Sequence, residues 1–164
     1  MYDMIYRVCK AYTIRNPEIG YCQGFNLIVG RFLKIMNEEE SFWMLVMVLE
    51  NYLPIDYYLN IQGIITDNNI LLELIKEKFP KLYNRSMEMD FQLSNVTFQW
   101  LCSLFSYNFS YHIVSQIWDQ FFLKGQKIIF RIALSIFHVM MPILMQAQDY
   151  MDINDAFRDV GLII

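Results

Sequence analysis

The chain has 164 residues, of which 55% are hydrophobic and only 18% are charged, and its net charge is −4. This length suits one domain with a sizeable core, and so apolar a composition excludes an intrinsically disordered chain. The basic residues are scattered along the sequence, which argues against binding of nucleic acid or electrostatic capture by a membrane.

Helical periodicity dominates the chain, because apolar residues recur every three or four positions and alternation with period two is rare. The first helix is marked by the stripe Tyr2, Ile5, Tyr6, Cys9 and Tyr12. It should end before Asn16-Pro17, since the residue before a proline avoids the helical region. A second helix is expected after Gly20, running to about Met36. The pattern therefore predicts an all-α fold of about nine helices.

The third helix has a clear start signal. Asn37 can cap it, and three glutamates follow in the first turn, where they complement the helix dipole. Residues 42–49 supply its buried face. Pro54 and the pair Tyr57-Tyr58 then indicate a break in the helical pattern.

Polar residues at the start of apolar segments predict the next helices. Asp67 can cap a helix over residues 68–79, and Pro80 suits the first position of another short helix. Ser94 and Ser110 are expected to cap two further helices, over residues 95–106 and 111–122.

The apolar stretch at 128–145 is long enough to cross a membrane, but Arg131, His138 and Pro142 interrupt it. A central arginine costs about 2.5 to 3.5 kcal/mol on insertion scales. We therefore expect a buried core helix over 126–145, kinked near Pro142, and no insertion into a membrane. Gly125 should end the helix before it, and Asn154 should start a last one.

The segment NPEIGYCQGFN, residues 16–26, departs from the helical pattern. Its Asn-Pro pair and two glycines predict a tight loop that places Tyr21, Cys22 and Gln23 at the mouth of the next helix. Considered by spacing alone, the glycines could equally serve to let two helices cross closely, with Gln23 solvated.

This segment resembles the glutamine-finger motif of the TBC domain, the all-helical module that activates Rab-type GTPases. The likeness continues through ITDNNILLELIKEKFPKLYNRS and through FQWLCSLFSYNFSYHIVSQIWDQFFLKGQKIIFRIALSIF, so that it covers nearly all 164 residues. The resemblance implies an orthogonal helical array in which residues 1–164 form the C-terminal part of such a domain. It also implies a GTP-bound Rab-type partner and no cofactor.

The resemblance assigns the glutamine finger to Gln23, a group that replaces the water-orienting glutamine of the GTPase itself. Tyr21, Cys22, Gly24 and Asn26 would shape the GTPase-binding loop around it. The chain would thus be a GTPase activator acting in trans rather than an enzyme, and it would regulate vesicle trafficking. Its expected location is the cytoplasm, with peripheral contact to endomembranes through the GTPase.

TBC domains also supply an arginine finger from an Ile-x-x-Asp-x-x-Arg motif upstream of the glutamine, and these 164 residues contain no such motif. Arg7 and Arg15 precede Gln23 but lack that context. We therefore expect either a domain that is incomplete at its N-terminus, with an exposed apolar face on the first helix, or a binding module without catalysis. A plain helical scaffold is a further alternative.

Two other groups of residues invite structural interpretations. Asp119 and Arg131 lie in apolar surroundings on consecutive helices, which predicts an ion pair that orients the two helices. The three cysteines lack the CxxC spacing or histidine partners of a zinc site, so reduced thiols and no metal are expected.

Overall fold

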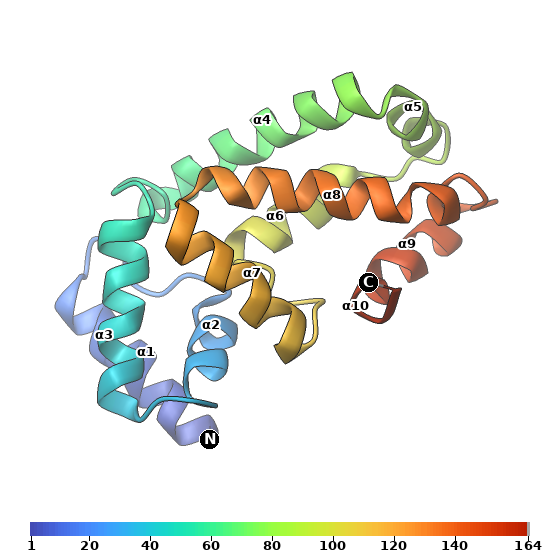
Figure 1. The fold of residues 1–164 in the computed structure, drawn as a ribbon. Coiled ribbons are helices and arrows are strands. Elements are labelled where there is room, and N and C mark those ends of the chain that lie inside the picture. The colour runs from blue at the N-terminus through green and yellow to red at the C-terminus, as the bar shows by residue number, and fades with distance from the viewer. Residues whose placement is uncertain (164) are drawn as a thin grey trace.

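In the computed structural model, which describes residues 1–163, every regular element is a helix (Figure 1). The ten α-helices of this range are α1 (Tyr2–Arg15), α2 (Phe25–Phe32), α3 (Glu38–Met47), α4 (Gln62–Lys78), α5 (Pro80–Glu88), α6 (Leu93–Cys102), α7 (Tyr111–Lys124), α8 (Lys127–Leu144), α9 (Tyr150–Arg158) and α10 (Val160–Ile163). A π-helical turn, Val48–Tyr52, extends α3, and a 3₁₀ turn, Leu59–Ile61, precedes α4. The prediction of an all-α fold is confirmed.

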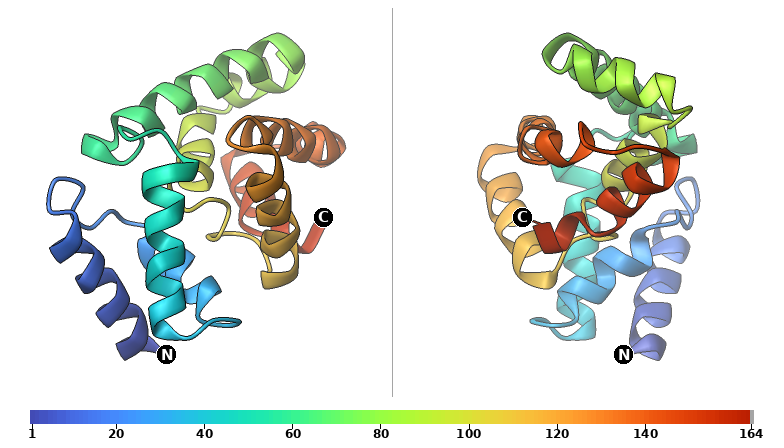
Figure 2. Two further views of the ribbon diagram at one scale, coloured as in Figure 1. Left: turned by 60° about the vertical axis from the view of Figure 1, so that its left-hand side comes forward. Right: turned by 90° about the vertical axis from the view of Figure 1, so that its right-hand side faces the viewer.

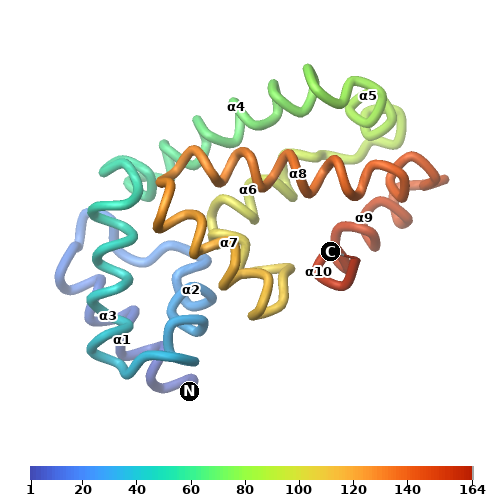
Figure 3. Tube along the Cα trace, viewed as in Figure 1, coloured from blue at the N-terminus to red at the C-terminus, as the bar shows by residue number. Residues whose placement is uncertain are grey.

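The helices form two groups that share one core. Helices α1, α2 and α3 pack on one another at one end, and α4 packs on α6 and α8 at the other (Figure 2). The chain then returns through α9 and α10, which lie beneath α8 in the trace of Figure 3. Trp100 of α6 is fully buried against Phe105 and Phe109 of the segment after α6, Phe137 of α8 and Phe157 of α9.

Several predicted helix ends are confirmed, because their signals are local. The Asn37 side chain accepts a hydrogen bond from the Glu40 backbone N–H, and the Glu40 carboxylate accepts one in return from the Asn37 N–H, at 3.0 Å each. Ser110 caps α7, and Pro80 opens α5. Gly125 ends α7 with a φ of +76°.

Other predicted starts are wrong, each for a tertiary or backbone reason. Helix α2 begins at Phe25 rather than after Gly20, since Gly24 has a φ of +113° that no α-helix includes. Asp67 lies inside α4, where its carboxylate accepts a hydrogen bond of 2.6 Å from Gln126. Helix α6 starts at Leu93, ahead of the expected cap Ser94.

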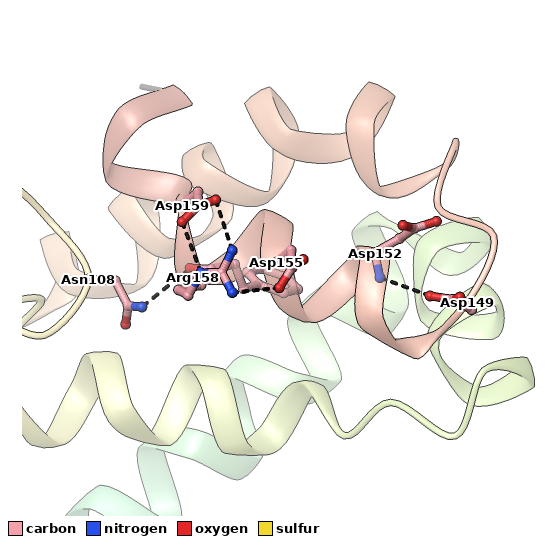
Figure 4. Close-up of polar contacts among 7 residues, drawn as sticks. Asn108, Asp149, Asp152, Asp155, Arg158 and Asp159 are labelled. Carbon is pink, nitrogen blue, oxygen red and sulfur yellow. Dashed lines mark hydrogen bonds and ion pairs between the residues drawn. The ribbon is translucent and has the colours of Figure 1, made fainter.

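Asn154 does not start the last helical segment. Asp149 caps α9 instead, with its carboxylate accepting a hydrogen bond of 3.0 Å from the Asp152 N–H (Figure 4). At the other end of α9, Arg158 pairs with Asp155 and Asp159. The polar residue that starts the helix is thus five positions earlier than predicted.

Helix α8 is the membrane candidate of the sequence, and by length and composition it is the one helix of residues 1–163 that could cross a membrane. In the structure one face of it belongs to the core, through the buried residues Ile128, Ile129, Ala133, Ile136, Phe137, Met140 and Leu144. Pro142 occupies the last turn of α8. This agrees with the prediction of a core helix.

The predicted ion pair between Asp119 and Arg131 is wrong. Both side chains are exposed, and within residues 1–163 neither has an ion-pair partner. Helices α7 and α8 are in contact. Ala133 is fully buried on α8, and Arg131 is two residues away, or about 200° around the helix, on the exposed side.

Candidate functional site

The loop between α1 and α2 is closed by its own polar groups. The Asn16 side chain accepts a hydrogen bond from the Ile19 N–H at 3.3 Å, and the Asn16 main-chain carbonyl accepts one from the Gly20 N–H at 3.0 Å. Farther on, the Phe25 N–H bonds to the Cys22 carbonyl at 3.1 Å. These bonds shape the backbone of residues 16–25 from within the loop.

Gln23 lies two residues before the start of α2 with its side chain exposed, as predicted. Its backbone is held, because its carbonyl is 2.8 Å from the Cys102 sulfur. Among residues 1–163 no side chain or backbone group bonds to the Gln23 amide. The loop therefore presents a free amide on a fixed main chain.

Gly24 is where the loop meets the end of α6. A Cβ atom at this position would lie 2.7 Å from the Cys102 carbonyl oxygen, far inside van der Waals contact. The φ of +113° also disfavours any side chain. Only glycine allows the backbone next to Gln23 to come this close to α6.

Gly24→Ala is expected to destabilise the protein by about 2 to 5 kcal/mol, the sum of a left-handed backbone penalty of about 1 to 2 and an overpacking cost of about 1 to 3. Gly125→Ala is the matched control, because its φ is +76° but nothing lies within 4 Å of the added Cβ. Urea unfolding of both variants measures the difference. Equal costs for the two substitutions would show that the contact with Cys102 is unimportant.

Two hollows flank Gln23. One, of about 500 Å³, is lined by residues of the loop, of α2 and of α6, namely Gln23, Gly24, Asn26, Leu27, Asn95, Phe98, Gln99, Cys102, Ser103 and Tyr107. The other, of about 490 Å³, shares Gln23, Phe98 and Cys102 with the first. It is also lined by Cys22, by Tyr58 and by the 3₁₀ turn residues Asn60 and Ile61. Gln23 thus lines both concave surfaces.

Positive φ values outside glycine occur in two segments near these hollows and also at Asp90. Asn60 and Ile61 have φ values of 51° and 55°, and Leu104 and Phe105 have values of 47° and 66°. Such conformations cost of order 1 to 3 kcal/mol each outside glycine and are typical of functional sites. One of these strained segments thus precedes α4, and the other follows α6.

The strained segment after α6 is tied to α2 by Arg31. Its guanidinium donates hydrogen bonds to the carbonyls of Ser106 and Phe109 at 3.0 and 2.6 Å. Burial lowers the pKa of Arg31. This side chain holds the connection between α6 and α7 in position beside the hollow.

The predicted site residues come together as expected in space. Tyr21 is exposed and donates a hydrogen bond of 3.2 Å to the Asn26 side chain, which links the loop to α2. Cys22 is half-buried and Gly24 is buried. Their contribution to function stays a prediction.

Sequence reasoning missed the α6 side of the site. Cys102 contacts both the loop and Tyr58, whose hydroxyl donates a hydrogen bond of 2.9 Å to the Cys102 carbonyl. Phe98 lines both hollows. The available signal was the pair Tyr57-Tyr58, whose hydroxyls need buried partners, but its partners are over forty residues away.

Helix α1 exposes apolar side chains, as expected. Tyr2 and Tyr6 are 89% and 64% exposed, and they line a third hollow of about 440 Å³ together with Tyr21 and Asn26. Arg7 pairs instead with Glu38 at the start of α3, at 2.6 Å, and Arg15 pairs with Glu50 of the following π-helical turn, at 3.1 Å.

Comparisons with known proteins agree on one family. A family model described as "Rab-GTPase-TBC domain" matches residues 1–145. Human "TBC1 domain family member 2A" is 36% identical over 158 residues, covering 95% of this chain and 17% of that protein. Human "Small G protein signaling modulator 3" is 32% identical over 155 residues, covering 94% of this chain and 21% of that protein.

A solved structure also matches. The crystal structure of the Chlamydomonas flagellar RabGAP TBC domain superposes with a TM-score of 0.81 at 29% identity, covering 98% of this chain and 57% of that one. The chain thus spans about a sixth to a fifth of the curated relatives, and just over half of the crystallised chain.

Proposed function

Since this chain belongs to the Rab-GTPase-TBC domain family, we propose that it promotes GTP hydrolysis by a Rab-type small GTPase, in trans, through Gln23. The observation that carries this proposal is the free, exposed Gln23 amide on a main chain held by the Cys102 sulfur. The chain acts as an activator, and the reacting phosphate and water belong to the GTPase.

The chemistry suits an amide. Hydrolysis of GTP needs an attacking water in line with the γ-phosphate. A glutamine can accept a hydrogen bond from that water through its carbonyl and donate another through its NH₂, without adding charge. A fixed backbone reduces the entropic cost of placing the amide, which is how positioning lowers a barrier.

The concave surface around Gln23 suggests where the partner docks. We propose that the GTPase docks on the two hollows beside Gln23, with Tyr21 and Asn26 on one side and the exposed α6 residues Asn95 and Gln99 on the other. Recruitment of this protein to endomembranes from the cytoplasm would follow from that contact. Residues 1–164 would act as one domain, an interpretation supported by the continuous core.

Positive charge against the phosphate is the second requirement, and the chain's own arginines near the loop do not supply it. The Glu38 carboxylate holds Arg7 through two hydrogen bonds and raises its pKa, and Glu50 does the same for Arg15. We propose that the arginine comes from an Ile-x-x-Asp-x-x-Arg segment outside these 164 residues.

A second candidate function, GTPase binding without catalysis, is favoured by the lack of an Ile-x-x-Asp-x-x-Arg motif in residues 1–164. Without that motif, residues 1–164 would hold a GTPase without accelerating hydrolysis, as a binding module. Both proposals require the same docking surface, and they differ in the rate of hydrolysis.

Binding tests the shared part of both proposals. Residues 1–164 are expected to bind some members of a Rab panel when these carry a non-hydrolysable GTP analogue, and at least about tenfold more weakly when they carry GDP, a difference of about 1.4 kcal/mol. Isothermal titration calorimetry measures both affinities. A triple variant far from the hollows, Lys76→Ala with Lys78→Ala and Lys81→Ala, should bind normally. Equal affinity for both nucleotide states across the panel would contradict the docking proposal.

A further inference from the structure

Two cysteines lie close together next to Gln23. The sulfur of Cys22, in the loop, lies 3.9 Å from that of Cys102, the last residue of α6, although 80 positions separate them in the chain. We propose that Cys22 and Cys102 form a reversible disulfide when the protein meets a peroxide, and that this bond displaces Gln23. The covalent part stands by itself, and the effect on GTP hydrolysis rests on the function proposed above.

The pair is accessible and asymmetric. Cys22 is half-buried and opens onto the 490 Å³ hollow, whereas Cys102 is 8% exposed. The Cys102 S–H can point to the Gln23 carbonyl, at 2.8 Å, or to the Cys22 sulfur. In the second orientation its hydrogen bond lowers the pKa of Cys22, which makes Cys22 the better nucleophile of the two.

Cys9 provides an internal comparison. It is 6% exposed on α1, and burial raises its pKa to about 11. Within residues 1–163 its sulfur makes no hydrogen bond to another cysteine. Oxidation should therefore select the Cys22–Cys102 pair.

The reaction proceeds in two balanced steps with hydrogen peroxide as oxidant. The Cys22 thiolate attacks one peroxide oxygen, an S–O bond forms, the O–O bond breaks, and hydroxide leaves, so that Cys22 becomes a sulfenic acid. The Cys102 sulfur then attacks the Cys22 sulfur, the S–S bond forms, and the S–O bond breaks. The departing hydroxide takes the Cys102 proton and leaves as water. The hydroxide released in the first step takes up the proton that Cys22 lost on becoming a thiolate, which gives the second water. In total two thiols lose two electrons and two protons, and peroxide becomes two waters.

Bond formation must move the loop. A disulfide needs about 2.05 Å between sulfurs, whereas the present distance is 3.9 Å. The end of α6 is anchored, because the Tyr58 hydroxyl holds the Cys102 carbonyl. Cys22 therefore makes most of the movement, and the Gln23 carbonyl loses its S–H donor. A displacement of about 1 Å can lower a catalysed rate about 10²-fold.

Peptide mapping tests the disulfide without any GTPase. Residues 1–164 are treated with hydrogen peroxide, blocked with N-ethylmaleimide, digested, and analysed by mass spectrometry with and without dithiothreitol. We expect one cross-linked peptide that joins Cys22 to Cys102 and disappears on reduction, while Cys9 carries the maleimide. Cys22→Ser and Cys102→Ser should each abolish the cross-link, and Cys9→Ser should retain it. Oxidation of Cys22 only to a sulfinic acid, or cross-links between molecules, would overturn the proposal.

A second measurement tests the consequence for Gln23. In a GTPase-stimulating form of the protein that carries Cys9→Ser, peroxide should lower stimulation by about 10²-fold, and dithiothreitol should restore it. If the cross-link forms completely and stimulation is unchanged, the proposed displacement of Gln23 is contradicted, but the proposed disulfide is still supported. If no form of the protein stimulates hydrolysis, the proposed function fails, and the mapping result still decides the disulfide.

Discussion

Joining a TBC segment that carries the Ile-x-x-Asp-x-x-Arg motif ahead of Met1 is expected to raise GTP hydrolysis by a responsive Rab GTPase about 10³- to 10⁵-fold above the rate with residues 1–164 alone. The reason is electrostatic. Negative charge develops on the phosphate oxygens in the transition state, and a water-orienting amide cannot neutralise it. The two arginines ahead of Gln23 are already paired with Glu38 and Glu50.

Single-turnover hydrolysis with excess activator measures this rate increase. The control is the same fusion with the motif arginine changed to alanine, which should bind the GTPase but return to the low rate. Full stimulation by residues 1–164 alone would show that the arginine assignment is wrong. A fusion that binds but never stimulates would favour the binding module.

Gln23→Ala in the stimulating fusion is expected to lower the rate of hydrolysis by about 10²- to 10³-fold, the size of loss seen when one preorganised polar group is removed from an active site. The amide is exposed and makes no hydrogen bond within residues 1–163, so the fold has little to lose. The free energy of unfolding should therefore change by no more than about 0.5 kcal/mol.

Gln116→Ala is the matched control, since Gln116 is an exposed glutamine on α7, outside both hollows. It should leave the rate unchanged. Gln23→Asn adds a sharper comparison, because it keeps the amide but draws it back by one methylene, and we expect it to be nearly as slow as Gln23→Ala. A Gln23→Ala protein that retains the full rate on every responsive GTPase would remove Gln23 as the water-orienting group.

Local chemistry accounts for the parts of the fold that could be predicted. The capping box of Asn37 and Glu40 and the proline that opens α5 act within a few residues, so their signals are complete in a short stretch of sequence. Asp67 shows the opposite case. It has the chemistry of a cap, but Gln126 on a distant segment gives its carboxylate a partner in the middle of a helix.

In the candidate site, too, some features have local sequence signals and others depend on distant contacts. The composition of residues 16–26 predicts a loop, and the position of Gln23 in the motif makes it exposed, so both could be read from the chain alone. The failed pair of Asp119 and Arg131 illustrates the limit, since two charges on neighbouring helices attract only if the helices turn them toward each other.

By itself, the sequence determined the helical class, the family and the identity of the exposed glutamine, because periodicity, turn residues and a short motif are properties of neighbouring residues. Only the tertiary structure decided what supports that glutamine. The end of α6 comes within contact of Gly24, and the sulfur of Cys102 reaches both Gln23 and Cys22 across about 80 residues of chain. Such contacts depend on how the helices pack around Trp100 and its aromatic neighbours, which no local pattern specifies.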